Sequence, residues 1–210
     1  SGNPCPPRME TTMKTLLAIA ATALLPTLAQ AGTPLFADDF NSNTYGLNKT
    51  PTGWSILDNG TVDVVGVGGF SNLCAAGGGM CIDLDGSSGN AGILSRSLSL
   101  TAGSTYTAYF DIAGSQRGGS ENLLVSFGSA TLSLNPLASN SPWTTYSLTF
   151  TPTASGAFGL TFNNAGGDNM GAMLDNVSVV AVPEPETYAL LLAGLGLMGT
   201  VARRRARKQA

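Results

Sequence analysis

The chain is 210 residues long, with 27 glycines, three cysteines, no histidine and a formal net charge of −3. The lack of histidine excludes Ser-His-Asp and Cys-His nucleophilic catalysis and the ordinary histidine-based zinc and iron sites. Residues 32–181 contain ten acidic and three basic side chains, a net charge of −7, so this part is more acidic than the total suggests. A domain of this charge repels nucleic acid and anionic lipid, which excludes both as its partners.

The N-terminal residues 1–12 contain several prolines and no apolar periodicity, and they do not begin with Met. We interpret them as a non-native leader or a misassigned start. Residues 13–31 follow the order of a signal peptide: Met13-Lys14 gives a positive start, Leu16–Leu28 an apolar helix, and Ala31 the small residue before a cleavage site. We predict export by way of a signal peptidase that cuts after Ala31. The alternative is a short buried helix.

Residues 32–181 have the length of one domain and the pattern of an all-β protein. In the segment 105–112, Tyr106, Ala108, Phe110 and Ile112 fall on one face of a strand, and segment 144–150 alternates in the same way. Gly, Asn, Pro and Ser separate about ten such runs, which is typical of a β-sandwich. The expected strands are 35–40, 62–67, 80–84, 93–100, 105–112, 123–127, 130–134, 144–150, 157–162 and 173–180.

Four landmarks stand in a suggestive order along this domain: Phe36–Phe40 at the start, Pro51–Trp54 after it, Tyr106–Asp111 in the centre, and Leu174–Ser178 at the close. This order resembles the jelly-roll, galactose-binding-like sandwiches that serve as carbohydrate-binding modules. The resemblance implies a jelly-roll β-sandwich, flanked in this chain by an N-terminal signal helix and a C-terminal transmembrane helix.

The resemblance also implies a calcium candidate, because the first and last strands of such sandwiches run close together and often share a structural calcium. The oxygens available there belong to Asp38, Asp39, Asn41 and Asp175, and calcium prefers six to eight oxygen ligands. The alternative is that one aspartate is solvated and the other caps a turn.

Cys74 and Cys81 are the only cysteines of this domain. In an oxidising compartment, an even pair across a short glycine-rich loop predicts a disulfide. A redox-active pair is the alternative, although active dithiols usually lie two residues apart near the start of a helix.

Sugar binding needs aromatic platforms beside planar polar groups. The candidates that lie near predicted loops or polar faces are Trp54, Tyr109, Asp111, Gln116, Arg117, Asp168 and Asn169. Arg117 is the sharpest of them, because it is one of three cations in the domain and stands between Gln116 and glycines. Each candidate also has a possible role in the core or in a turn.

An enzyme is the least favoured function. Asp83 and Asp85 lie at i and i+2 of a predicted strand, a spacing of roughly 6.5–7 Å that an acid–base pair could use. A solvated or metal-bound strand end explains this pair more simply, so we predict no catalytic residue.

The tail, residues 182–210, begins with Val182-Pro183-Glu184-Pro185 and continues with the uncharged run 188–202. Fifteen residues of helix reach about 22 Å, and arginine side chains can extend to the lipid headgroups. We therefore expect a transmembrane segment at 188–202, with Arg203, Arg204 and Arg205 on the cytoplasmic side. A core helix is the alternative.

The Pro-Glu-Pro element, the apolar run and the terminal arginines, in this order, resemble the PEP-CTERM sorting signal of Gram-negative bacteria that produce polysaccharide. The resemblance implies cleavage by an exosortase that recognises Pro183, Glu184 and Pro185. It further implies export across the inner membrane, transient anchoring there, and delivery to the outer surface or the extracellular matrix. Sandwich domains of such proteins also carry a Cys-to-Cys glycine loop and a Gln-Arg-Gly turn, here 74–81 and 116–118.

The expected function is therefore that of an exported, processed protein whose non-catalytic sandwich associates with exopolysaccharide. A structural biofilm protein without a specific ligand is the rival hypothesis, and a glycan-active enzyme comes third.

Overall fold

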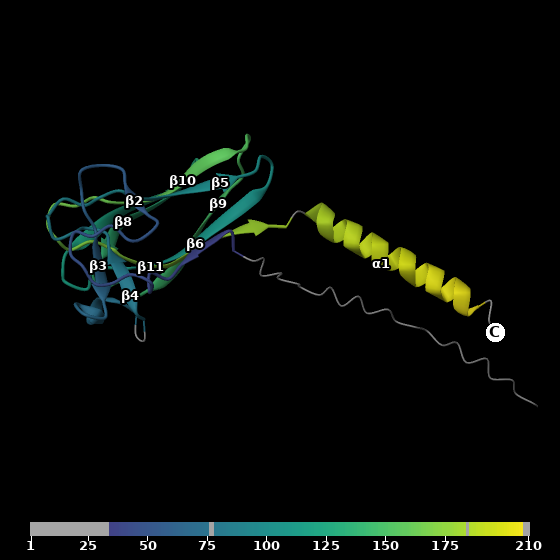
Figure 1. Cartoon of the computed structure of the whole chain (residues 1–210), viewed down its shortest axis with the longest axis horizontal. Coiled ribbons are helices and arrows are strands. Elements are labelled where there is room, and N and C mark those ends of the chain that lie inside the picture. The colour runs from purple at the N-terminus through teal and green to yellow at the C-terminus, as the bar shows by residue number, and fades with distance from the viewer. Residues whose placement is uncertain (1–33, 76–77, 184, 208–210) are drawn as a thin grey trace, which may run out of the picture. The chain divides into compact units, whose positions relative to one another are not determined.

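The computed structural model describes residues 34–75, 78–183 and 185–207. The predicted leader, the signal peptide with Ala31, and Glu184 lie outside the described residues. Within the described part, the strands form two antiparallel sheets that enclose one main apolar core (Figure 1). The expectation of an all-β sandwich is confirmed.

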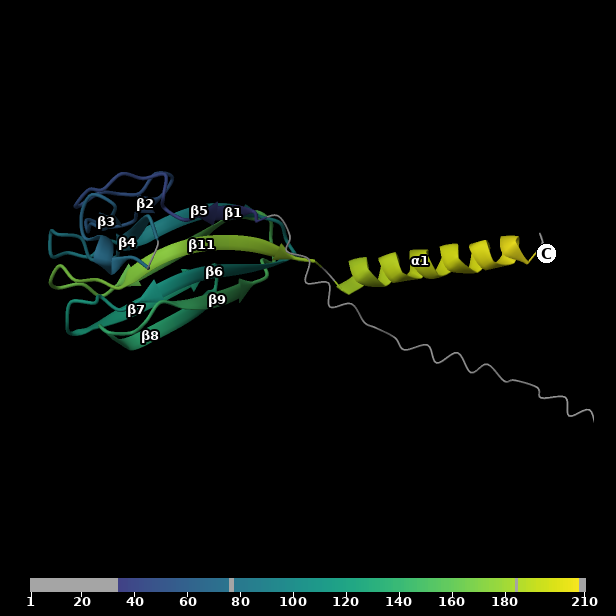
Figure 2. The same ribbon diagram turned by 90° about the horizontal axis from the view of Figure 1, so that it is seen from below.

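The first sheet has six strands in the order β3 (Asp63–Gly66), β4 (Met80–Asp83), β11 (Met173–Val182), β6 (Thr105–Ala113) and β9 (Thr144–Phe150), with β1 (Phe36–Asp38) beside β11. The second sheet has five strands in the order β2 (Ser55–Ile56), β5 (Leu94–Leu100), β10 (Gly156–Asn164), β7 (Ser120–Phe127) and β8 (Ala130–Ala138). Figure 2 shows β11, β6 and β9 lying side by side.

The core follows from the period-two pattern of the strands. On β6, Tyr106, Ala108, Phe110 and Ile112 are all buried, as the alternation predicts. Phe110 meets Phe162 of the opposite sheet edge-to-face, with ring centroids 5.2 Å apart. Contacts of this kind, repeated along the inner faces, hold the two sheets together.

The first and last strands pair, as expected from the resemblance: Ala37 lies opposite Ser178 of β11. The pairing of β11 with β6 shifts its register between Asp175 and Ser178, and Asn176 has a φ of 51° at that point. This bulge places one extra residue in β11. As a result, Asp175 and Ser178 both lie on the outer face of the first sheet.

A second apolar cluster covers part of the outer face of the first sheet. It consists of Val65, Leu73, Cys74, Cys81, Ala113 and Met173, with Trp143 packed against it. Leu73 belongs to the short 3-10 helix η1 (Ser71–Leu73). Cys74 and Cys81 form a disulfide, which confirms the predicted pairing.

The tail forms the helix α1 (Pro185–Ala206), whose last turn carries Arg203, Arg204 and Arg205. Among the described residues, no helix is both long and apolar enough to cross a membrane. The expected transmembrane segment 188–202 lies within α1 and stays a prediction.

Candidate functional site

The outer face of the first sheet presents a patch around Tyr109, which projects from the middle of β6 and is 42% exposed. Its direct neighbours are Ser178 on β11 and Ser147 on β9. Side chains directly opposite on adjacent strands lie about 4.5–5.5 Å apart at Cβ. Because both neighbours are serines, they leave the tyrosine ring accessible.

Asp111 lies two residues further along the same face, between Asp175 on β11 and Thr145 on β9. Its carboxylate accepts hydrogen bonds from the Thr145 hydroxyl, at 2.5 Å, and from Asn176 Nδ2, at 2.9 Å. These contacts fix the orientation of the carboxylate and leave lone pairs for a ligand hydroxyl. We call Tyr109, Asp111, Thr145, Ser147, Asp175 and Ser178 the tyrosine patch.

Asp175 is the buried member of the tyrosine patch. One of its oxygens accepts a hydrogen bond from the backbone N–H of Asn176 at 2.7 Å. The pKa of Asp175 is raised to about 6, mainly by burial and further by the negative charges of Asp111, Asp39 and Asp38, against the lowering effect of that hydrogen bond. The patch therefore carries closely spaced negative charge.

The predicted calcium ligands are only partly brought together. Asp38 and Asp39 act on Asp175 electrostatically, but both oxygens of Asp38 accept hydrogen bonds, from Phe40 N and from Trp54 Nε1. Asn41 Oδ1 accepts one from Met80 N. Across the described residues, no three Asp, Glu, Cys or His side chains are grouped as a metal centre. Calcium at this corner stays a prediction.

Trp54 is not an exposed platform. Its ring is 8% exposed and packs between Phe36, Phe40 and Phe162, while its Nε1 donates to Asp38. The expectation that Trp54 lies on a ligand-accessible loop was wrong, because the preceding turn directs the ring into the core.

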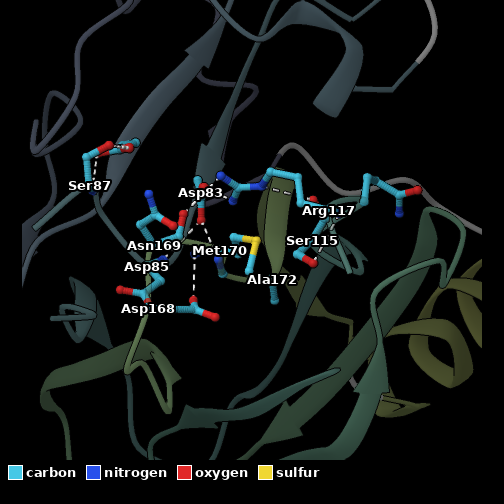
Figure 3. A network of polar contacts seen from close by, with 12 residues as sticks. Asp83, Asp85, Ser87, Ser115, Arg117, Asp168, Asn169, Met170 and Ala172 are labelled. Atoms are coloured by element: carbon cyan, nitrogen blue, oxygen red, sulfur yellow. Dashed lines mark hydrogen bonds and ion pairs between the residues drawn. The ribbon is translucent and has the colours of Figure 1, made fainter. Parts of the chain in front are cut away.

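Of the other predicted ligand residues, Arg117, Asp168 and Asn169 belong to one polar network (Figure 3), and Gln116 precedes Arg117 in the chain. Arg117 forms an ion pair with Asp83 and donates a hydrogen bond from Nη1 to the carbonyl of Asn169 at 2.9 Å. Asp168 Oδ1 accepts one from Met170 N. Gln116, at a φ of 58°, donates from Nε2 to the carbonyls of Gly114 and Ser141.

The side chains of Arg117 and Gln116 connect loops of the fold. The Arg117 guanidinium donates hydrogen bonds to Asp83 and to the carbonyl of Asn169, and the Gln116 amide nitrogen donates to two carbonyls of neighbouring turns. Tyr109 and Asp111 are predicted residues that lie outside this network, on the outer face of the first sheet.

Asp83 is the buried centre of this network. Its Oδ1 accepts hydrogen bonds from the backbone N–H groups of Gly171, at 2.8 Å, and Asp85, at 3.1 Å. Burial raises the pKa of Asp83 to about 7, although the Arg117 guanidinium and these hydrogen bonds lower it. β4 ends at Asp83, so Asp85 lies beyond the strand and not on its face as the i, i+2 spacing suggested.

Two further buried carboxylates lie near this network: Asp85, which the sequence analysis weighed only in a pair with Asp83, and Glu121, which it did not single out. Asp85 has no exposed surface, and Glu121 on β7 is 6% exposed. Asp85 Oδ2 accepts a hydrogen bond from Gly167 N at 3.3 Å, whereas its Oδ1 has no partner. Glu121 accepts one from Asn164 Nδ2 at 3.2 Å. One sequence signal could have pointed to Glu121. It is the sole glutamate of the domain, and it precedes Leu123, Val125 and Phe127 at alternating positions.

A small cavity of about 190 Å³ adjoins these groups. It is lined by Gly119, Ser120, Glu121 and the loop Ala165–Asp168. A larger one of about 440 Å³ lies elsewhere, lined by Asn41, Asn43, Thr44, Tyr45, Val67, Gly79 and Met80. Beside Tyr45, the ring of Phe70 is 51% exposed.

Two family models match the chain. The one described as "Protein of unknown function (DUF642)" matches residues 34–180, and the PEP-CTERM protein-sorting motif matches residues 181–208. The resemblance of the tail to a PEP-CTERM signal is thereby confirmed. No curated protein matches this chain.

Solved structures share the fold at low identity. A cyclase from Fischerella sp. TAU, in complex with 4-(1H-indol-3-yl)butan-2-one, is 21% identical with a TM-score of 0.51, over 69% of this chain and 94% of that one. The CBM22-1 xylan-binding domain from Paenibacillus barcinonensis Xyn10C is 13% identical, also with a TM-score of 0.51, over 74% and 99%. These likenesses show the fold alone, a β-sandwich like those of the cyclase and of the CBM22-1 domain.

Proposed function

Since the chain belongs to the DUF642 family and ends in a PEP-CTERM sorting motif, we propose that it is an exported, exosortase-processed protein that binds neutral polysaccharide without catalysis. Proteins with this motif are sorted to the cell surface by exosortase. The tyrosine patch is the part of the sandwich that we propose binds the glycan.

The observation that carries the proposal is the exposed Tyr109 ring beside an oriented carboxylate. A pyranose ring has an apolar face that stacks on an aromatic ring and hydroxyls that donate to carboxylates. Tyr109 supplies the first group and Asp111 the second, while Ser147 and Ser178 add hydroxyls on either side. The xylan-binding domain of the same fold is a further support.

The charge of the patch selects among glycans. Asp111 and Asp175 lie opposite each other, so an anionic polysaccharide such as alginate meets like charge. A neutral polymer meets no such repulsion. We expect neutral glycans to bind and acidic ones to be rejected.

The test is affinity electrophoresis of the full chain in gels that contain soluble xylan, a neutral β-glucan or alginate. We expect neutral polymers to retard the wild type, and Tyr109→Ala to weaken this binding about tenfold, since the ring supplies about 1.4 kcal/mol of stacking. Phe70→Ala, which truncates another exposed aromatic ring, is the matched control and should keep the retardation.

Equal retardation of wild type and Tyr109→Ala would overturn the placement of the site. No retardation by any polymer would favour the rival function, a structural surface protein without a specific ligand. A structural protein without a ligand would also use Arg117 and Gln116 as they are used here, in hydrogen bonds within the fold.

A further inference from the structure

The cluster around Asp85 holds more negative charge than its surroundings balance. Asp83, Asp85 and Glu121 are 1%, 0% and 6% exposed, and the guanidinium of Arg117, which pairs with Asp83, acts electrostatically on all three carboxylates. Among the described residues, the bond between Arg117 and Asp83 is the only ion pair. Buried carboxylates are stable as anions only when a cation or enough hydrogen bonds compensate them.

No other basic side chain of the domain is available for this cluster. Lys49 Nζ donates to the carbonyl and hydroxyl of Thr44. Arg96 lies over the ring of Phe36, 4.6 Å from its centroid, and bonds the carbonyl of Gly53. The chain has no histidine, so further compensation must come from outside the protein or from protons.

Asp85 Oδ1 is the oxygen of this cluster that lacks a hydrogen-bond partner. The side chain is fully buried, and its second oxygen already accepts from Gly167 N, yet Oδ1 has no partner. Burial raises the pKa values of both Asp85 and Glu121 and the charge of Asp168 adds to this, although backbone hydrogen bonds from Gly167 and Asp168 lower the pKa of Asp85 and the bond from Asn164 lowers that of Glu121.

A cavity of about 190 Å³ lies next to this position, on the loop that covers Asp85. Glu121 and Asp168 line it, together with the main chain of 165–167. Asp85 lies directly under that main chain, since Gly167 donates to it and a Cβ on Gly166 would stand 2.8 Å from Asp85 Oδ2. Glycine at 166 therefore lets the loop approach the carboxylate (Figure 3 shows Asp85 and Asp168 in this network).

We propose that Asp85 and Glu121 bind a divalent cation of the calcium type beneath the loop Ala165–Asp168, a site distinct from the corner of the first and last strands. Calcium is a hard cation that takes carboxylate, carbonyl and water oxygens in flexible geometry. Because the described side chains include no group of three acidic ligands, carbonyls and water supply most of the ligands. This predicts an affinity of about 10⁻⁴–10⁻³ M, as in extracellular calcium modules.

The test compares melting temperatures of the full chain in EDTA and in about 10 mM calcium chloride, a concentration well above that dissociation constant. Mass action predicts an increase of about 3–8 °C with calcium. Asp85→Asn should remove most of this increase, and so should Glu121→Gln. Asp175→Asn, which alters the other acidic corner, should retain it.

Three results would overturn the proposal: no difference between EDTA and calcium in the wild type, an increase that persists in both Asp85→Asn and Glu121→Gln, or one that only Asp175→Asn abolishes. If Asp85 is simply protonated, Asp85→Asn stabilises the protein while calcium leaves the wild type unchanged, which also contradicts it. Equilibrium dialysis of the wild type against radioactive calcium decides the matter if the variants fail to fold.

Discussion

Single residues in this protein are held by hydrogen bonds that the sequence pattern does not reveal. Arg117 looked like a ligand-binding cation because it stands among glycines, yet its guanidinium joins Asp83 to the loop that contains Asn169. Trp54 looked exposed because it follows a Pro-x-Gly turn, but it is core. In both cases the decisive partner is distant in sequence, 34 residues away for Arg117 and 16 for the Trp54 indole. Only the folded chain brings those partners together.

Asp83 makes the stability of the protein depend on pH. Burial raises its pKa from 3.8 to about 7, so the folded state holds a proton that the unfolded state has already released between about pH 4 and pH 7. The unfolded state binds fewer protons in that window, and the free energy of unfolding therefore falls as the pH rises. In EDTA, the melting temperature should fall from pH 5 to pH 7 and level off above it.

The variant Asp83→Asn cannot ionise, so its melting temperature should fall less over the same interval. Asp58→Asn, at an acidic group outside this network, is the matched control and should follow the wild type. A wild-type melting temperature that rises from pH 5 to pH 7 would contradict the assignment to Asp83.

At the scale of elements, strands with clean alternation were predicted almost to their ends. The expected strand 144–150 is β9, and 105–112 is β6 less one residue. β8 was expected to end at Leu134, but it continues through Pro136 to Ala138. It is an edge strand, and an edge tolerates a residue without an N–H. The two-residue strand β2 was missed, because two residues carry no period.

The acidic cluster could not be predicted at this scale either. Asp85 follows β4 of the first sheet, whereas Glu121 lies on β7 of the second sheet. The loop 165–168, which contacts Asp85 and lines the cavity together with Glu121, connects the two positions. By contrast, the calcium corner was inferred from the pairing of first and last strands. That pairing is confirmed, while each of the four expected ligands accepts at least one hydrogen bond. Calcium at that corner stays a prediction that Asp175→Asn tests.

The disulfide holds the segment that carries η1 against the first sheet. Cys74 and Cys81 belong to the second apolar cluster, with Leu73 and Met173. Closing so short a loop stabilises the folded state by about 2–3 kcal/mol in the chain-entropy model. We expect Cys81→Ser to lower the melting temperature by about 4–10 °C.

The wild type treated with reductant is the matched control for this variant, because it loses the bond without gaining a buried hydroxyl. If its melting temperature equals that of untreated protein, the bond contributes no stability. Labelling of both cysteines in exported, unreduced protein would show that the bond does not form.

The whole chain combines a β-sandwich with a sorting tail, and the order of parts could be inferred from sequence because each has its own composition. The family models cover 34–180 and 181–208 in that order. The apolar run 188–202 lies within helix α1. Helix α1 is longer than that run because Pro185 can begin a helix and Arg203–Arg205 can end one favourably.

Processing is the prediction that belongs to this scale. In cells with an exosortase, we expect the mature protein to begin at Gly32 and to lose its tail near Pro183, as measured by intact mass spectrometry. Pro183→Ala combined with Pro185→Ala should retain the tail, and so should the wild type in cells without the exosortase. A wild-type mass that includes residues 188–202 in exosortase-containing cells would show that the motif is not cleaved.

Binding of glycans by the exported protein is measured most directly on a glycan array with the full chain, comparing wild type, Tyr109→Ala and Phe70→Ala. We predict that the wild type and Phe70→Ala bind a common set of neutral glycans, that acidic glycans give no signal, and that Tyr109→Ala loses that set. Absence of any bound glycan for the wild type, or an unchanged set for Tyr109→Ala, would contradict polysaccharide recognition through the tyrosine patch.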